Sequence, residues 1–365
     1  MLLLSHRKFI RCRNLRANDS GIILIVVLWI LAILSIFVFI VGWGARTEIS
    51  YAKYRVAKVK TKQYVWAGII FGLDQLTKDV STEKNKLKYF WFSKNNKVAP
   101  QNLATKISVD TGYFQIGYRT RLADNDPYTI YQGFQDETGR INLNGLTLNN
   151  YHVLEQLLII LGFDNAVALN VAASVVDWID RDNTPAEQGQ GAEDSYYMSL
   201  SKPYHCKNLP LDSIEELLFI KGITSDIFQA LKPYVTVFPK YSGLRENFNT
   251  ASEEVLKALA RSVVGPQTNT TREDADSLVG KILDYQEELS SQFSNNDKKM
   301  DFNDIKLNAK EQAIYLTINP YRAIQPGVVR FDIQGAEPSS HVETNIEVVV
   351  DPQTSNILSW QETTP

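Results

Sequence analysis

The sequence predicts an α+β protein in which a long N-terminal helix packs on an antiparallel sheet and a large all-α domain is inserted between the strands. Three observations support this prediction. An uncharged apolar run, residues 22–44, continues into an amphipathic segment without proline. Strand patterns occur before residue 140 and after residue 320. The region between them has helical spacing, so the economical topology is an insertion whose two ends lie close together.

The chain begins with a basic leader, which we predict to be residues 1–21. Five Lys/Arg residues and then Gly21 precede the apolar run. A secretory signal is cleaved after its apolar segment, whereas the processing point predicted here lies before it, so the apolar helix stays on the mature protein. This is the layout of a prepilin. We expect a prepilin peptidase to create a new N-terminus at Ile22, and this terminus to be methylated.

The apolar run predicts a single membrane-spanning helix over residues 22–44. Its 23 residues are long enough, at about 1.5 Å per residue, to cross a hydrocarbon core about 30 Å thick. Lys and Arg residues lie on both sides of the run, so their count does not decide its orientation. The leader layout favours a cytoplasmic N-terminus, because the leader peptidase faces the cytoplasm. We therefore expect the C-terminal bulk in the periplasm, tethered to the inner membrane.

The composition of the rest is that of a folded, water-exposed protein, with 22% charged residues in the whole chain and a formal net charge of -3 at pH 7. This balance gives no electrostatic reason to expect a nucleic-acid partner. The two cysteines are Cys12, in the leader, and Cys206, so leader removal would leave one thiol and no internal disulfide. A chain of 365 residues is longer than one small hydrophobic core usually organises, so two globular parts are expected.

The flanking regions, residues 45–140 and 321–365, are predicted to form one α/β domain. Between 46 and 78, apolar residues recur at three- and four-residue steps, which predicts an amphipathic continuation of the membrane helix. Aromatic-rich stretches on both sides of the turn residues 124–127 predict a hairpin. Near the C-terminus apolar and polar residues alternate over 329–333 and 342–350, and a further short segment follows at 357–360. This pattern predicts an antiparallel meander with one face exposed to water.

The middle region, residues 141–320, is predicted to be the inserted all-α domain. Asp212 and Ser213 are predicted to cap its third helix, whose first turn carries two glutamates, because the helix dipole favours carboxylates there. The predicted helices are 148–161, 165–179, 211–220, 225–231, 251–263, 272–289 and, with a weaker pattern, 303–314.

Five ordered segments resemble the type II secretion system protein K family, the large minor pseudopilins. They are DETGRINLN at 136–144, DWIDRDNTP at 177–185, GAEDSYY at 191–197, KNLPLDSIEELLFIKGIT at 207–224 and NFNTAS at 247–252. The resemblance implies a pilin-like fold and a position at the tip of the periplasmic pseudopilus, which supports export of folded proteins across the outer membrane. It also implies a complex with two other minor pseudopilins, of the protein I and protein J type, and a filament of the major pseudopilin.

The fifth residue after the predicted cleavage point is Val26. The resemblance gives this position a meaning, because pilin-like subunits usually carry a glutamate here that neutralises the N-terminus of the subunit ahead. An ionised side chain deep in the bilayer costs about 2.5–3.5 kcal/mol, so it is retained where a partner charge compensates it. A subunit at the tip has no such partner, and Val26 is a residue that a tip position permits.

A cluster of carboxylates is the predicted ion site. Asp177, Asp180 and Asp182 fall at the end of a predicted helix, and a short loop with two glycines follows. Glu193 and Asp194 come next. Carboxylates at a helix C-terminus repel the negative end of the dipole and one another, and a cation would relieve both. Oxygen-only ligands suit Ca²⁺, which the resemblance also implies. The alternative is a solvated acidic loop whose aspartates cap neighbouring helices.

Residues 214–231 resemble a helix-hairpin-helix, which raises the alternative of a membrane-tethered, competence-type DNA-binding protein. Such hairpins bind phosphates through backbone amides of a glycine-rich turn, helped by lysines. Here Thr224 stands where the second glycine would be, and seven acidic residues outnumber six basic ones from 207 to 260. DNA affinity depends on cation contacts to phosphate, so we interpret the segment as a packing unit and expect no nucleic-acid partner.

The sequence contains no evident catalytic constellation. His152 lies between apolar neighbours on a predicted helix, and His205 adjoins Cys206. Residues adjacent in sequence rarely share the geometry that nucleophilic catalysis needs, so both histidines are predicted to be structural. The glycines form no phosphate-binding motif. We therefore predict a structural assembly protein rather than an enzyme.

Overall fold

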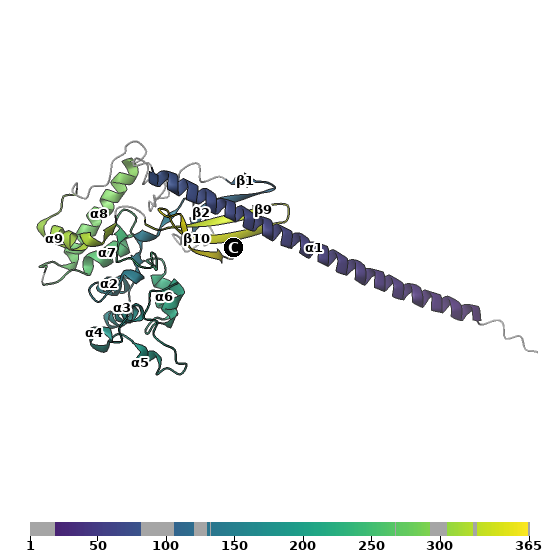
Figure 1. Cartoon of the computed structure of the whole chain (residues 1–365), viewed down its shortest axis with the longest axis horizontal. Helices are drawn as coiled ribbons and strands as arrows, with labels where there is room; N and C mark the ends of the chain where they lie inside the picture. The colour runs from purple at the N-terminus through teal and green to yellow at the C-terminus, as the bar shows by residue number, and fades with distance from the viewer. Residues whose placement is uncertain are drawn as a thin grey trace, which may run out of the picture. The chain divides into compact units, whose positions relative to one another are not determined.

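A computed structural model describes residues 19–81, 106–119, 130–131, 133–266, 268–292, 305–323 and 327–363. The chain forms two compact units, one ending at Val59 and the other beginning at Lys60, and helix α1 (Asp19–Ser81) contributes to both (Figure 1). Most of the predicted leader and the predicted turn at 124–127 lie outside the described residues.

The first unit is the N-terminal part of α1. Its large apolar side chains from Ile22 to Trp43 are between 44% and 69% exposed. By length and composition this helix can cross a membrane, in agreement with the predicted span. Ser35 donates a hydrogen bond to the carbonyl oxygen of Leu31 at 2.7 Å, so its hydroxyl is satisfied within the helix. The segment is thus suited to hydrocarbon, where exposure of apolar side chains has no hydrophobic cost.

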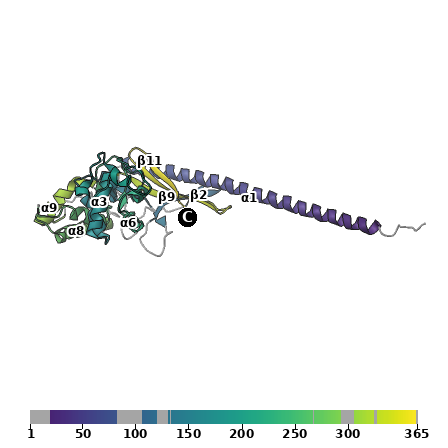
Figure 2. The ribbon, with the colours of Figure 1, turned by 90° about the horizontal axis from the view of Figure 1, so that it is seen from below.

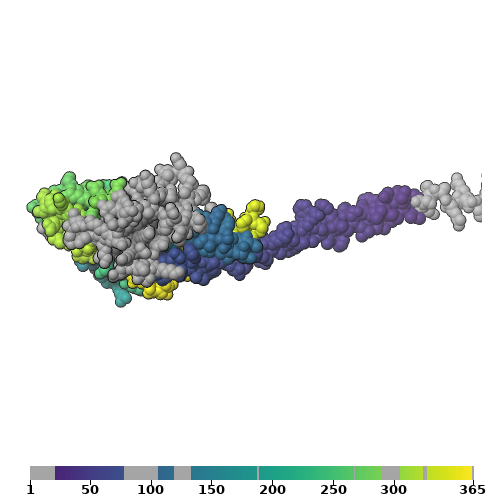
Figure 3. Space-filling view, turned by 90° about the horizontal axis from the view of Figure 1, so that it is seen from above, coloured from purple at the N-terminus to yellow at the C-terminus, as the bar shows by residue number. Residues whose placement is uncertain are grey.

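The second unit contains an antiparallel sheet with the strand order β1-β2-β9-β10-β11, in which β3 pairs with β2 and β4 with β9. Pairing of β2 with β9 joins segments that lie on opposite sides of the helical region in sequence; Figure 3 shows the blue and yellow segments next to each other. The predicted α+β class is confirmed. The strands are β1 (Ile107–Val109), β2 (Gly112–Arg119), β3 (Ile130–Tyr131), β4 (Gln135–Asp136), β9 (Val329–Glu337), β10 (Val342–Asp351) and β11 (Asn356–Thr363).

The C-terminal part of α1 packs along this sheet (Figures 1 and 2). Two glycines allow the close approach. A Cβ at Gly68 would lie 2.6 Å from Cγ2 of Ile333, and a Cβ at Gly72 would lie 2.9 Å from a ring carbon of Phe331. The buried side chains of this core are Tyr64, Val65, Ile69, Leu76, Phe114, Ile116, Phe134, Val329, Phe331, Ile333, Ile346, Val348 and Val350.

The helical region has a core of its own, shared by helices and short 3-10 turns from Ile141 to Ile318. Two predicted helices, 165–179 and 225–231, have the observed bounds, and the others begin or end within a few residues of them, except near 211 and 303. The elements are η1 (Glu137–Gly139), η2 (Leu143–Gly145), α2 (His152–Ile160), α3 (Asn165–Ile179), α4 (Ala186–Gly189), α5 (Asp194–Tyr197), η3 (Ile214–Phe219), α6 (Ser225–Leu231), α7 (Glu253–Arg261), α8 (Arg272–Gln292), α9 (Ala309–Ile318) and η5 (Asn319–Tyr321).

Two details of the helical region differ from the sequence-based prediction. It also contains two short parallel ladders, formed by β5 (Ile141–Asn142) with β6 (Val235–Thr236) and by β7 (Glu246–Asn247) with β8 (Arg322–Ala323). The helix predicted at 211–220 is the 3-10 turn η3, and its N-cap residue Ser213 makes no side-chain cap hydrogen bond. The neighbouring Asp212 is not a cap either, because its carboxylate binds the ammonium groups of two lysines, Lys207 and Lys240.

A partly buried ion-pair network connects the helical region to the sheet. Arg330, on β9, donates to both carboxylate oxygens of Glu137, at 2.7 and 3.1 Å, and to Glu347 on β10 at 2.6 Å. Glu137 is fully buried, lies 3.3 Å from Arg140 and accepts a 2.7 Å hydrogen bond from Thr236 of β6. Glu137 and Arg330 therefore join the β9–β10 pair, in the interior of the sheet, to the first ladder of the insert.

Candidate metal centre

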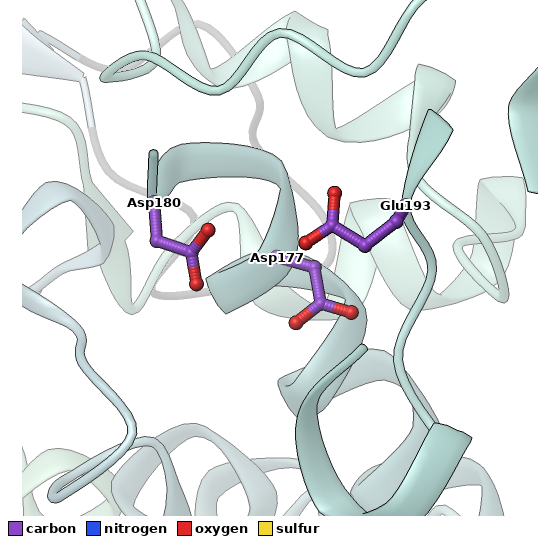
Figure 4. A group of neighbouring side chains, drawn as sticks. All are labelled: Asp177, Asp180 and Glu193. Carbon is purple, nitrogen blue, oxygen red and sulfur yellow. The ribbon is translucent and has the colours of Figure 1, made fainter. Parts of the chain in front are cut away.

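Three predicted carboxylates meet where α3 ends and α5 begins. Asp164 starts α3 by accepting the amide of Ala166 at 2.8 Å, and Asp180 is the C-cap residue. Asp177 lies in the last turn, and Glu193 is the N-cap residue of α5. One ligand oxygen from each of Asp177, Asp180 and Glu193 lies within 4.8 Å of the others, and Figure 4 shows the three side chains next to one another. No other group of this kind occurs among the residues that the structure describes.

Asp177 is fully buried and only partly satisfied. Its Oδ1 accepts the backbone N–H of Ala186 at 3.0 Å, whereas its Oδ2 has no hydrogen-bond partner in the described part of the chain. The carboxylate lies against the backbone of Gly191, where any Cβ would overlap it. A larger residue at 191 would therefore displace the Asp177 side chain, so the glycine keeps space for it.

Glu193 is 2% exposed, and within the described residues neither of its carboxylate oxygens has a hydrogen-bond partner. A buried carboxylate without donors is costly, because its charged form loses water and gains nothing in return. Together with Oδ2 of Asp177, the cluster thus presents three buried oxygens that lack a donor. This combination is what a bound cation would satisfy.

The pKa values of the cluster also indicate that its negative charges are not compensated. Burial, and then the charges of Asp177, Asp180 and Asp182, raise the pKa of Glu193 to about 7. Burial, and then Asp182 and Asp177, raise the pKa of Asp180 to about 6. Burial also raises the pKa of Asp177. Without a counter-ion the three groups cannot all ionise cheaply near pH 7.

The two remaining predicted ligands lie outside this group of three. Asp182 is exposed, and its Oδ1 accepts the N–H of Thr184 at 2.7 Å, which shapes the loop after α3. Asp194 accepts the N–H of Cys206 at 2.7 Å on Oδ1, and its Oδ2 lies 3.0 Å from Nδ1 of His205. Both aspartates thus hold backbone amides of loop segments, and neither caps a neighbouring helix through these bonds.

Two residues that sequence reasoning did not assign to the site lie beside it. Lys221 donates to the carbonyl oxygens of Gln190 and Gly191, both at 3.0 Å, so it holds the loop that carries Glu193. Cys206 is buried, and its thiol donates to the carbonyl oxygen of Asp177 at 3.5 Å. Burial, with Glu193 and Asp177 as further contributors, raises the pKa of this thiol to about 12, so it is protonated at neutral pH. No local pattern in the sequence predicts either contact.

The helix-hairpin-helix-like segment also has a packing role in the structure. Its turn, between η3 and α6, contains Gly222 at a φ of +81°. The adjacent Lys221, which a phosphate-binding hairpin would use, is engaged by the two loop carbonyls described above. Thr224 caps α6 by accepting the N–H of Ile227 at 3.2 Å.

The helix-on-sheet unit, the helical insert and the apolar helix of membrane-spanning length define a class, the α+β proteins with an N-terminal helix that is able to cross a membrane. Residues 139–240 match the family model of type II secretion system (T2SS), protein K. The chain is also similar to a solved chain of the GspK-GspI-GspJ complex from enterotoxigenic Escherichia coli, with a TM-score of 0.54 and 17% sequence identity, covering 84% of this chain and 98% of that chain. This structural likeness shows the fold.

Curated relatives agree with the family model. The type II secretion system protein K of Pectobacterium carotovorum subsp. carotovorum is 40% identical over 101 residues, 28% of this chain and 30% of that protein. The protein K of Klebsiella pneumoniae is 26% identical over 204 residues, 51% of this chain and 61% of that protein. The matched segments span less than two thirds of these relatives. The family that the matches support is type II secretion system protein K, and the DNA-binding alternative has no support from them.

Proposed function

We propose that this chain is a minor pseudopilin at the tip of a type II secretion pseudopilus, where it initiates or caps assembly and supports export of folded proteins across the outer membrane. The observation that carries the proposal is the match of residues 139–240 to protein K, in a chain that also has a pilin-like domain and a membrane-length apolar helix. We assign it a structural, non-enzymatic role.

Two features support the position at the tip. The helical insert adds a second core to the pilin-like domain. A head of this size at the leading end would block addition of a subunit ahead of it, so growth would proceed from the membrane side. Val26 offers no charge to the N-terminus of a subunit ahead, and a tip subunit needs none.

The partners follow from the same proposal. The solved chain of similar fold comes from a complex with GspI and GspJ. The corresponding partners of this chain would be minor pseudopilins of the protein I and protein J type, with the major pseudopilin below them. The chain would cross the inner membrane once, with its C-terminal bulk in the periplasm, after prepilin peptidase has cleaved between Gly21 and Ile22.

The test is to express the full chain with and without prepilin peptidase and the two partner pseudopilins of the same system. Mass spectrometry should find a methylated N-terminus at Ile22 when the peptidase is present, and the three pseudopilins should copurify. Gly21→Val should block processing, whereas Gly42→Val, a matched glycine with open space around it, should not. A purified protein that begins at Met1 despite the peptidase, or one that has lost residues 22–44, would contradict the proposal.

We further propose that the acidic cluster binds Ca²⁺. The donor set is made of carboxylate oxygens alone, which suits this ion, and three of the oxygens are buried without a donor. Asp177, Asp180 and Glu193 would hold the ion, with Asp182 close by. Asp194 is the least suited of the predicted ligands, since both of its oxygens already have partners. The ion supplies positive charge, and these residues then tie the end of α3 to the start of α5.

A further inference from the structure

We propose that the stretch of α1 just beyond the membrane-spanning segment is a binding site for the phosphate groups of anionic phospholipids. The inference goes beyond the proposed function and depends on it only for the leaflet, which is the periplasmic leaflet of the inner membrane in the proposed topology. The site, called the collar below, consists of three aromatic and three basic side chains: Trp43, Arg46, Tyr51, Lys53, Tyr54 and Arg55.

The collar occupies one side of the helix. At about 3.6 residues per turn, its members fall within an arc of about 200° around the helix axis. The apolar residues Ile49, Ala52 and Val56 fall on the remaining side, and Glu48, the single acid from 45 to 59, lies at the boundary. The helix therefore presents an aromatic and basic side and a separate apolar side, so one contact does not have to serve both.

The side chains of the collar are exposed. Trp43, Tyr51 and Tyr54 are 66%, 54% and 52% exposed, and the basic members are exposed as well. The guanidinium carbon of Arg55 lies 5.0 Å from the centre of the Tyr51 ring, which is a cation–π contact. A guanidinium held over a ring keeps the N–H donors in its own plane available to an anion.

The collar lies at the level of the lipid headgroups. Relative to the end of the apolar run, Arg46 lies about 3 Å further along the helix, Tyr51 about 10 Å and Arg55 about 16 Å. The headgroup layer is about 5–8 Å thick on each side of a bilayer, and its field extends by a Debye length of about 8 Å. The collar thus begins inside the headgroup layer and ends at the limit of its electrostatic reach.

Both kinds of side chain in the collar suit this level. Trp and Tyr are enriched at the membrane–water interface, because their rings are apolar and their N–H or O–H groups are polar. Arg and Lys bind phosphate through charge-assisted hydrogen bonds, which Arg forms in pairs. The cations between 46 and 55 therefore favour an anionic lipid over a zwitterionic one.

The proposed topology makes these charges unexpected unless a ligand compensates them. Lys and Arg are in excess on the cytoplasmic side of membrane spans. In the proposed topology, however, four of them follow the span on the periplasmic side, between residues 45 and 59. Phosphate groups of the adjacent leaflet would supply the compensating negative charge, which gives a physical reason for these residues.

An acidic helix of another chain is the competing ligand. Helices associate outside the membrane by burying apolar side chains, and on α1 these lie on the side away from the collar. Contact on that side leaves the collar facing lipid. Trp43 and Tyr54 also lie between Arg46 and Arg55 around the helix, where rings suit a headgroup layer and offer no charge to an acidic partner.

The test counts the lipids that stay bound to the full chain. The protein is reconstituted in nanodiscs of equal parts phosphatidylglycerol and phosphatidylcholine, and native mass spectrometry measures the lipids that it retains after release. We expect more retained phosphatidylglycerol than phosphatidylcholine, and we expect Arg46→Gln/Lys53→Gln/Arg55→Gln to lower this ratio about fivefold or more. The basic leader is the same in both proteins, so the difference belongs to the collar.

The matched control is Lys202→Gln/Lys232→Gln/Lys310→Gln, which removes the same charge from exposed positions outside α1 and should leave the ratio unchanged. Four results would overturn the inference. They are a ratio close to one, an equal fall in the ratio for the control, loss of phosphatidylglycerol to excess inorganic phosphate at constant ionic strength, or a collar variant that keeps its ratio but no longer copurifies with the partner pseudopilins.

The last of these results would assign the collar to an acidic helix, and loss to inorganic phosphate would assign it to free phosphate. Processing and copurification separate the inference from the proposed function. If the full chain is cleaved before Ile22 and copurifies with the protein I- and protein J-type partners but shows no lipid preference, the collar is assigned wrongly and the proposed function stands.

Discussion

At the scale of single residues, Glu193 and Asp180 are acids whose protonated forms are favoured by folding. Burial is the main cause, and it raises their pKa values to about 7 and about 6 from ordinary values of 4.5 and 3.8. Between the unfolded and folded pKa values the folded chain binds more protons than the unfolded chain. Stability of the ion-free protein is therefore full at low pH and falls as pH rises through this window.

The loss of stability with rising pH leads to a prediction for the combined effect of Ca²⁺ and pH. From about pH 5 to pH 8 we expect these two acids to cost the ion-free protein on the order of 2–4 kcal/mol of unfolding free energy, at about 2–4 °C in melting temperature per kcal/mol. Ca²⁺ should restore it, and apparent Ca²⁺ affinity should rise with pH, because the ion displaces protons. Thermal unfolding with Ca²⁺ and with a chelator measures both effects.

Matched variants decide whether the cluster is responsible. Glu193→Gln should remove most of the pH slope and the stabilisation by Ca²⁺. Asp226→Asn, which neutralises an exposed aspartate in the first turn of α6, should leave both unchanged. A Glu193→Gln protein that kept the full Ca²⁺ shift would show that the ion binds elsewhere.

At the scale of elements, the contact between α1 and the sheet depends on glycine at a helix-interior position. A Cβ at Gly68 would lie 2.6 Å from Ile333, whereas a Cβ at Gly280, inside α8, would meet nothing within 4 Å. Both positions gain about 1 kcal/mol of helix propensity from Gly→Ala. Overpacking at Gly68 costs about 1–3 kcal/mol, so Gly68→Ala should be destabilised relative to Gly280→Ala by that amount.

Denaturant unfolding of the two variants in detergent, followed by tryptophan fluorescence, checks this difference. The propensity gain is common to both, so the difference isolates the packing term. Equal stabilisation by the two substitutions would mean that α1 does not pack on the sheet as closely as described.

Sequence patterns predicted the elements whose signals are local. Helices α3 and α6 have the predicted bounds because Asp164 and Thr224 cap them directly. The two parallel ladders of the insert escaped prediction, since strands of two residues have no periodicity. The sequence also did not predict that η3 is a 3-10 turn. The Asp212 carboxylate, which was predicted to cap a helix there, is instead bound by lysines, and one of them, Lys240, is distant in sequence.

In the candidate site, too, only the part that depends on local spacing could be predicted from the sequence. Asp177 and Asp180 are one helical turn apart, so their proximity follows from local spacing. Glu193 and Asp194 are adjacent, and nothing local distinguishes them, yet one lies in the cluster and the other holds Cys206. Contacts with residues distant in sequence, His205 and Cys206, hold Asp194 outside the cluster.

At the scale of the whole molecule, Glu137 links the helical insert to the antiparallel sheet. Burial alone would raise the pKa of this carboxyl, but Arg140 and Arg330 outweigh it and lower the pKa to about 2. The ion pairs of Glu137 with the two arginines therefore stabilise the fold above about pH 4.5. This contribution is lost as the pH falls toward 2. This network links the helical insert to the sheet, so it is the junction to test.

Arg330→Ala should leave Glu137 as a buried charge with fewer donors, at a cost of about 3–5 kcal/mol. Lys62→Ala is the matched control, because Lys62 and Glu362 form a 3.3 Å pair whose side chains are 47% and 40% exposed, and such pairs contribute about 0–1 kcal/mol. Unfolding free energy at pH 7 measures the loss, and limited proteolysis near residues 137–140 and 322–328 should become faster in Arg330→Ala alone. If both variants lost the same small amount, the insert would be held by its apolar contacts and the ion pairs would be dispensable.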